Sequence, residues 1–114
     1  MTNCLFCKII AGEIPGTILY QDDHLVILKD INPQAPTHAL VVPRRHIATL
    51  NDLAPEDDGL IGEMTRRAAA FAREQGHGEG GYRTVFNCNA AAGQTVYHIH
   101  LHVLGGRAFS WPPG

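Results

Sequence analysis

The sequence predicts an α+β fold in which one long helix packs on a mainly antiparallel, five-stranded sheet. Three observations lead to this prediction: β-prone segments outnumber helical ones, strands and helices do not alternate regularly, and the links between strands suit hairpins. The 114 residues, 45% of them hydrophobic, suffice for one core but not for two. We therefore expect a single domain over residues 1–114.

The first half of the chain is divided by glycine and proline into one short helix and three strands. Apolar residues recur on one side of the first segment until Gly12 ends it. Pro33 and Pro36 mark a loop, and Pro43 closes the strand that follows it. The expected elements are a helix over 4–12, strands over 17–20, 24–28 and 38–42, and a loop over 30–37.

The second half contains the longest element, a helix over residues 55–75. Pro55 suits its first turn, acidic residues follow at its positive end, and Gly76 terminates it. Its apolar residues recur at helical spacing and should face the sheet; they are Leu60, Ile61, Met64, Ala68, Phe71 and Ala72. The remaining expected elements are strands over 82–88 and 96–104 and a small-residue loop over 89–94.

The last strand carries three histidines in alternation, because residues 98–104 read His-Ile-His-Leu-His-Val-Leu. Successive side chains of a strand point to opposite faces, so His98, His100 and His102 should share one face. Histidine acts as base, acid, nucleophile or metal ligand near neutral pH. Such a row can surround a small anion or bind a metal, and the strand alone does not decide which. A plain solvent-exposed polar face is the less favoured interpretation.

The turn before the histidines favours an anion. Residues 90–95 read Ala-Ala-Ala-Gly-Gln-Thr, and small residues let backbone N–H groups approach an anion closely. Thr95 adds a hydroxyl donor. A donor-rich turn beside a potential nucleophile suggests chemistry at a phosphate.

For His38 and Asp30 the sequence allows either a role in the site or a purely structural one. His38 begins a strand, where it either serves the site or bonds to the backbone. Asp30 precedes the loop and either accepts ribose hydroxyls or caps the loop through its own backbone. His24 and His77 lie in polar, turn-like contexts and are expected at the surface.

The cysteines suggest a metal or free thiols. Cys4 and Cys7 have the spacing of half a tetrahedral zinc site, for which His46 and His98 are candidate partners. Two reduced thiols in a short helix are the alternative. With Cys88 the count is odd, which argues against a disulfide framework.

Bulk properties exclude several classes. The net charge of −2 argues against a nucleic-acid-binding surface. No apolar run is long enough to cross a bilayer, so we expect no membrane partner. The first residues do not resemble a secretory signal, which favours the cytoplasm.

Several segments together resemble the histidine triad nucleotide-binding family, in particular its Hint branch. They are residues 4–10, 30–38, 93–97, 98–104, 105–107 and 111–114. The Trp-Pro-Pro-Gly tail is similar to the Hint branch rather than to the dinucleoside polyphosphate hydrolases. The resemblance implies a five-stranded antiparallel sheet that pairs with a second copy into a ten-stranded sheet. It also implies hydrolysis of the P–N bond of purine nucleoside 5′-monophosphoramidates, releasing AMP or GMP and an amine, with no cofactor required.

The resemblance assigns the chemical roles. His100 matches the nucleophile, which forms a covalent nucleotidyl-histidine intermediate. The backbone carbonyl of His98 fixes its tautomer, and His102 donates to the phosphoryl oxygens. His38 matches a fourth histidine that supports His100. Thr95 stands near the leaving group, where the family often has serine.

The resemblance also assigns binding residues. Asp30 matches the ribose-binding acid, and Trp111 lies in the tail that reaches the partner chain's leaving-group side. The apolar base pocket corresponds to Leu5, Phe6, Ile9, Leu28 and Ile31. Contacts near the phosphate and ribose correspond to Asn87, Gly93, Gln94, Thr95, His100 and His102. A structural zinc of some bacterial members has ligands that match Cys4, Cys7, His46 and His98.

Two other functions compete with this hydrolase. The triad would form a three-histidine zinc site in a metalloenzyme. Alternatively, the fold would be a nucleotide-binding scaffold without catalysis, although the intact histidine set speaks against that.

Overall fold

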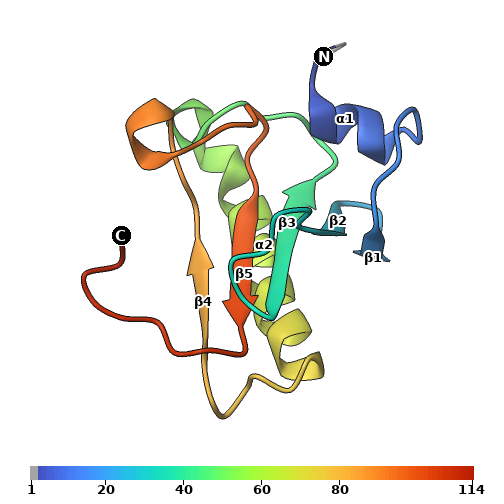
Figure 1. Cartoon of the computed structure of the whole chain (residues 1–114). Helices are drawn as coiled ribbons and strands as arrows, with labels where there is room; N and C mark the ends of the chain where they lie inside the picture. Colours follow the sequence, from blue (N-terminus) through green and yellow to red (C-terminus); the bar gives the residue numbers. More distant parts are fainter. Residues whose placement is uncertain (1–2) are drawn as a thin grey trace.

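The computed structural model describes residues 3–114 and contains one antiparallel sheet with helices on both faces (Figure 1). The strands are ordered β1-β2-β3-β5-β4 in the sheet, and every neighbouring pair is antiparallel. Their bounds are β1 Ile18–Gln21, β2 Leu25–Lys29, β3 Thr37–Pro43, β4 Tyr82–Val85 and β5 Leu101–Gly105. The predicted fold class is therefore confirmed, with the histidine-bearing strand β5 in the interior of the sheet.

Two α-helices and three 3-10 turns complete the described part of the chain, residues 3–114. The α-helices are α1 Leu5–Ile10 and α2 Asp58–Glu74, and the 3-10 turns are η1 Leu50–Asp52, η2 Pro55–Asp57 and η3 Ala90–Ala92. Gly12 and Gly76 follow the two helices with positive φ angles of 78° and 89°, as their positions in the sequence predict. None of the helices in residues 3–114 is long and apolar enough to span a membrane.

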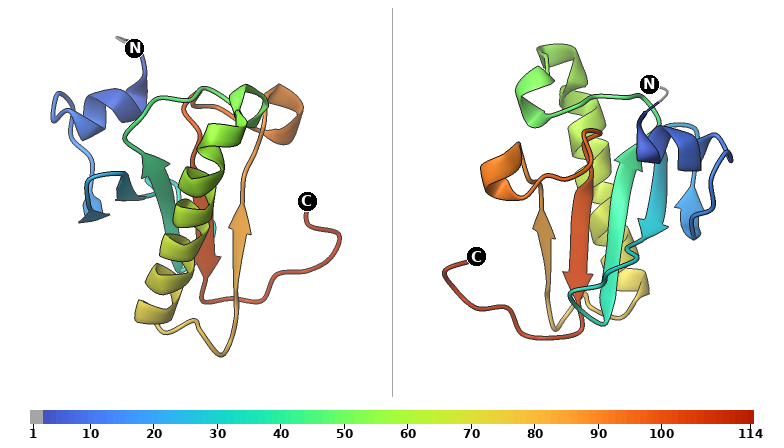
Figure 2. Two further views of the ribbon diagram at one scale, coloured as in Figure 1. Left: turned by 180° about the vertical axis from the view of Figure 1, so that it is seen from behind. Right: turned by 45° about the horizontal axis from the view of Figure 1, so that its top comes forward.

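Helix α2 covers one face of the sheet and α1 lies against the other (Figure 2). The alternation of β2 divides its side chains between these faces: Leu25 and Ile27 pack with α2, whereas Val26 and Leu28 pack with Phe6 of α1. All six apolar residues predicted to face the sheet from α2 belong to the core on that side or pack against it. Met64, Ala68, Phe71 and Ala72 are buried, and Leu60 and Ile61 are half-buried.

Most predicted boundaries lie within two residues of the observed ones, but three are wrong by three residues or more. The helix over 55–75 begins as a 3-10 turn and becomes α-helical only at Asp58. The strand over 82–88 ends at Val85, and the strand over 96–104 begins at Leu101. The last error has an identifiable cause, because the N–H of Ile99 donates to the carbonyl of Ile47 at 2.8 Å, in the loop beyond the end of β3. His98 and His100 therefore precede β5 instead of lying on it.

The alternation of side chains nevertheless continues through this segment. Ile99, Leu101 and Val103 all belong to the apolar core on the α2 side of the sheet. His100 and His102 line a cavity on the opposite face, together with Phe6 and Leu28. The predicted separation of histidines from aliphatic residues thus holds even where the regular strand does not.

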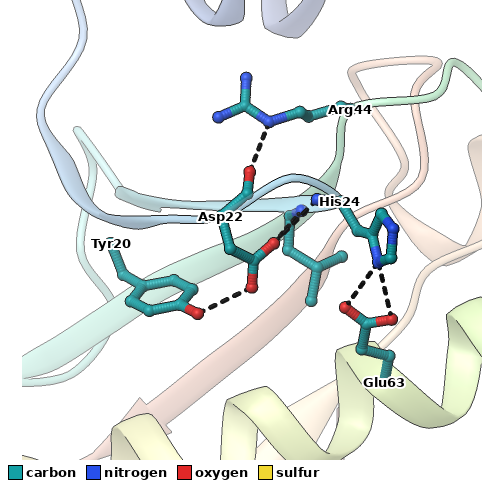
Figure 3. Close-up of polar contacts among 6 residues, drawn as sticks. Tyr20, Asp22, His24, Arg44 and Glu63 are labelled. Atoms are coloured by element: carbon teal, nitrogen blue, oxygen red, sulfur yellow. Dashed lines mark hydrogen bonds and ion pairs between the residues drawn. The ribbon is translucent and has the colours of Figure 1, made fainter.

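The turn between β1 and β2 is tied to α2 by polar contacts (Figure 3). Asp22 accepts from the Tyr20 hydroxyl at 2.7 Å and from the backbone N–H groups of His24 and Leu25. His24 is exposed, as expected, and its Nδ1 lies 3.1 Å from the carboxylate of Glu63 on α2. These contacts connect the edge of the sheet to the helix that covers it.

The expectation that His77 is a surface residue is wrong. His77 is half-buried, and its Nε2 lies 2.9 Å from the hydroxyl of Thr37 at the start of β3. Its ring also packs on Gly105 at the end of β5, where an added Cβ would lie 2.6 Å from Cδ2 of the ring. The loop after α2 is thereby attached to two strands of the sheet.

Candidate active site

A cavity of about 510 Å³ opens on the sheet face opposite α2 and collects residues from both ends of the chain. Helix α1, the β2–β3 loop, the turn after β4 and the segment 93–102 all contribute to its wall. The predicted site residues that line it are Leu5, Phe6, Ile9, Leu28, Asp30, Ile31, His38, Asn87, Gly93, Thr95, His100 and His102. The fold therefore brings most of the predicted nucleotide-binding set together.

The other predicted residues lie elsewhere. His98 is fully buried beside Cys4 and Cys7, behind the cavity wall. Gln94 is also buried and is not among the lining residues. Trp111 is 82% exposed in the C-terminal tail and makes no part of the cavity wall within residues 3–114.

The backbone carbonyl of His98 fixes the tautomer of the His100 imidazole. The Nδ1 of His100 donates to the backbone carbonyl of His98 at 2.8 Å. A neutral imidazole carries one N–H, so Nε2 of His100 retains its lone pair. Burial lowers the pKa of His100, which keeps the ring neutral. The edge-on ring of Phe6, 5.0 Å away between centroids, fixes the orientation of the imidazole. The result is an uncharged imidazole at the cavity wall, with its Nε2 lone pair free of a proton.

His38 contacts His102. Its Nε2 lies 2.9 Å from Nδ1 of His102 and 3.3 Å from a carboxylate oxygen of Asp30. The backbone N–H of Gln34 donates to Nδ1 of His38 at 3.0 Å, so the proton of a neutral His38 is on Nε2. That proton is donated to Nδ1 of His102, which leaves the N–H of His102 on Nε2.

The electrostatics of the site favour neutral rings throughout. Burial lowers the pKa of His38. Burial also lowers the pKa of His102 to about 4, and the neighbouring imidazoles of His100 and His38 add to the effect. Asp30 opposes these shifts through its negative charge. Its other oxygen accepts from the N–H of Asn32 at 2.8 Å, so Asp30 also caps the loop as the sequence allowed.

Four ligand-type atoms gather at the N-terminal end of helix α1. The sulfurs of Cys4 and Cys7 and the Nδ1 atoms of His46 and His98 all lie within 4.8 Å of one another. Cys4 Sγ is 3.3 Å and Cys7 Sγ is 3.5 Å from Nδ1 of His98, and the two Nδ1 atoms are 3.2 Å apart. Ligands held at about 2.0–2.3 Å from a tetrahedral zinc lie roughly 3.3–3.8 Å from each other. This cluster fits zinc.

A hydrogen bond behind this cluster supports the same assignment. The Nε2 of His98 donates to the carbonyl of Pro43 at 2.7 Å, which leaves Nδ1 unprotonated and facing the two sulfurs. His98 is therefore turned away from His102, and the three triad histidines do not converge on one point. The geometry gives no support to a three-histidine zinc site on the triad.

Sequence reasoning missed part of the cavity wall. Pro15, Gly16, Thr17 and Lys29 line it, although the segment around Gly16 reads only as a break in the sequence. A Cβ at Gly16 would lie 2.7 Å from Cγ2 of Ile9, so the glycine lets this segment pack on α1. Gly16 was the one sign in the sequence of a close approach at this segment, but a glycine does not indicate which residue packs against it.

The antiparallel sheet, the cavity on one of its faces and the neutral buried histidine at the cavity wall suit the active site of an enzyme. A family model described as "Scavenger mRNA decapping enzyme C-term binding" matches residues 3–110. The chain is 50% identical to the purine nucleoside phosphoramidase of Escherichia coli K12 over 103 residues, which are 90% of this chain and 87% of that protein. This chain belongs to the histidine triad family and is one of its hydrolases.

Solved structures agree with this assignment. A histidine triad family hydrolase from Legionella pneumophila Philadelphia 1 has a TM-score of 0.96 and 54% sequence identity, over 98% of this chain and all of that one. A zinc-bound histidine triad family protein from Mycobacterium smegmatis has a TM-score of 0.79 and 38% identity, over 93% of this chain and 76% of that one.

Proposed function

We propose that the protein hydrolyses the P–N bond of purine nucleoside 5′-monophosphoramidates through a covalent nucleotidyl-histidine intermediate. One observation carries the proposal: Nδ1 of His100 donates to the carbonyl of His98 at 2.8 Å and leaves Nε2 with its lone pair at the cavity. The name of the Escherichia coli relative supports this substrate class.

The reaction proceeds in two displacements at the α-phosphorus. Nε2 of His100 attacks and forms an N–P bond while the P–N bond to the amine breaks, and the amine leaves with a proton taken from solvent. Water then attacks the same phosphorus, the N–P bond to His100 breaks, and the water supplies the oxygen of the nucleotide product while one of its protons returns to solvent. His102 donates its Nε2 proton as a hydrogen bond to the phosphoryl oxygens, where charge accumulates. Thr95 lies near the leaving group.

The remaining wall of the cavity suits a nucleoside. The carboxylate of Asp30 accepts ribose hydroxyls, and Leu5, Phe6, Ile9 and Leu28 provide an apolar surface for the base. Ile31 is 97% exposed at the cavity, and covering such a side chain with a flat base removes apolar area from water. A cavity of about 510 Å³ accommodates a ligand of this size.

We also propose a structural zinc on Cys4, Cys7, His46 and His98. The donor set and the spacing of its atoms support it. When bound, the metal crosslinks α1 to the loop after β3 and to the segment before β5, and it takes no part in the displacement. A reducing compartment such as the cytoplasm keeps both thiols available for it.

We further propose that two copies pair through the free edge of β4 into a ten-stranded sheet. Strand β4 is hydrogen-bonded to β5 alone among the strands of residues 3–114. An exposed strand edge favours pairing with another strand. The 82% exposed Trp111 then becomes available to the leaving-group side of the partner's site.

The test is turnover of adenosine 5′-phosphoramidate by the wild type, His100→Ala and the matched control His24→Ala. His24 is an exposed histidine outside the cavity, so its variant should keep full turnover. We expect His100→Ala to abolish both turnover and the nucleotidyl-enzyme trapped by acid quench. Equal turnover by His100→Ala and wild type would refute the proposal.

A further inference from the structure

Gln94 lies behind the turn that precedes the histidines and makes three hydrogen bonds with its side chain. The residue is 5% exposed. Its Oε1 accepts from the backbone N–H of Asn89 at 2.8 Å, and its Nε2 donates to the carbonyls of Ala48 at 2.8 Å and Val96 at 3.1 Å. The buried amide therefore joins both ends of the turn to the loop after β3.

The residue that Gln94 holds has an unusual backbone. Asn89 has φ 69° and ψ −179°, and it is the single non-glycine residue with positive φ within residues 3–114. This region is costly for any residue with a Cβ and persists only where surrounding contacts impose it. The carbonyl of Asn89 also accepts from the N–H groups of Ala92 at 3.3 Å and Gln94 at 3.1 Å. Gln94 thus contacts Asn89 through its side chain and through its backbone.

The turn held in this way forms one wall of the cavity. Gly93 and Thr95 line the cavity with His100 and His102. Gly93 has a φ of 90° and closes the 3-10 turn η3, so its position depends on the conformation that begins at Asn89. The side chain of Gln94 points away from this wall, into the protein.

We propose that Gln94 is a positioning residue, whose buried amide holds Asn89 in its strained conformation and so places Gly93 and Thr95 against the phosphate of a bound nucleotide. The proposal rests on the proposed function for the identity of the ligand. Without the side-chain amide, Asn89 relaxes to an ordinary backbone conformation, and the Gly93–Thr95 backbone moves relative to His100. Groups placed before the ligand arrives lower the cost of binding it.

The experiment compares Gln94→Ala, Asn89→Gly and the double variant. Glycine adopts the backbone conformation of Asn89 without strain, so the double variant no longer needs the amide. We expect Gln94→Ala to weaken AMP binding about tenfold, Asn89→Gly to bind like wild type, and the double variant to recover most of the loss. Calorimetry well below the melting temperature separates this effect from stability. AMP binding by Gln94→Ala equal to wild type, or a double variant as weak as Gln94→Ala, would overturn the proposal.

A second readout does not depend on the ligand. In the free protein, the ring chemical shifts of His100, which lies six positions from the nearer substitution and lines the cavity with Gly93 and Thr95, should change in Gln94→Ala and return in the double variant. Unchanged shifts in Gln94→Ala contradict the proposal even if its activity falls. Should Gln94→Ala not fold, Gln94→Met keeps the buried volume without the polar atoms. A wild type that turns over no phosphoramidate refutes the proposed function, while these shifts still test the role of Gln94.

Discussion

His38 and His102 form a hydrogen-bonded pair, with Nε2 of one 2.9 Å from Nδ1 of the other. The N–H of Gln34 on the far side of His38 gives the pair a direction, because it leaves Nε2 as the donor. The protein therefore presents His102 to the cavity with its proton outward, and in the proposed reaction His38 acts on the phosphate through His102.

This pairing predicts non-additive kinetics. His38→Asn and His102→Asn should each lower kcat/KM by about 10–100-fold, because either change removes the oriented N–H donor. The double variant should lose no more than the worse single variant, since both act on one hydrogen bond to the phosphate. Steady-state kinetics on adenosine 5′-phosphoramidate of the wild type, the two single variants and the double variant test this. Losses that multiply in the double variant would show that the two rings act independently.

The lowered pKa of His102 predicts a loss of stability in mild acid. Its pKa is about 4 in the folded protein and 6.5 in the unfolded chain, so the unfolded chain takes up the proton first as the pH falls. Above pH 6.5 the ring is neutral in both states, so the protein has its full stability. Between pH 6.5 and about pH 4 the unfolded chain binds the proton and the folded protein does not, so the stability falls. We expect the free energy of unfolding to fall by on the order of 2 kcal/mol over this window. Urea titrations of wild type and His102→Asn measure it; equal losses in both would contradict the assignment to His102.

Asp22 predicts a loss at lower pH. The hydrogen bond from Tyr20 and those from the backbone of His24 and Leu25 lower the pKa of its carboxyl from 3.8 to about 2. The ionised form is favoured by folding, so its contribution is present above pH 3.8 and is lost as the pH falls to about 2. Allowing for solvent screening, Asp22→Asn should cost about 1 kcal/mol at pH 7 and nothing at pH 2. Asp23→Asn, at the exposed neighbouring position, is the control for both denaturation curves.

His77 and Gly105 predict a steric coupling. An alanine at Gly105 puts its Cβ 2.6 Å from the His77 ring, which the hydrogen bond to Thr37 holds in place. Gly105→Ala should destabilise the protein by about 1–3 kcal/mol, as overpacking does elsewhere. Combining it with His77→Ala opens space, so the double variant should lose less than the sum of the single changes. Thermal unfolding of the four proteins tests this, and full additivity would count against contact between the two residues.

Removal of the proposed zinc should lower the stability of the protein, and this effect should depend on Cys4 and Cys7. A chelator should lower the melting temperature of the wild type, because it breaks the link between α1 and the segment before β5. Cys4→Ser/Cys7→Ser should start lower and be insensitive to the chelator. Cys88→Ser, outside the cluster, should respond like wild type. Metal analysis of the purified protein and melting curves measure these outcomes; a wild type without bound zinc would refute the site.

The sequence predicts the fold well where the signal is local. The alternation of His98, His100 and His102 with aliphatic residues is a property of neighbouring positions, so it correctly separates the two faces. The neighbours of each histidine are not local. His98 meets Cys4 from the other end of the chain, and His102 meets His38 across the sheet.

The errors have the same origin. The strand over 96–104 is shortened because Ile99 bonds to Ile47, in a loop that the pattern of residues 96–104 does not encode. The polar character of His77 suggests the surface, although Gly105 leaves room for its ring. The inward direction of the Gln94 amide, toward the carbonyl of Ala48, likewise depends on a contact with a distant part of the chain.

The strand order has a consequence for how the protein can be assembled from parts. β5 fills the place between β3 and β4, although it is the last strand along the chain. Residues 1–95 therefore lack the strand that joins β4 to the rest of the sheet, and residues 96–114 bring both this strand and the histidine row. Completion of the sheet and placement of His100 and His102 at the cavity are thus one event, so a molecule without β5 in place has neither a continuous sheet nor the proposed site.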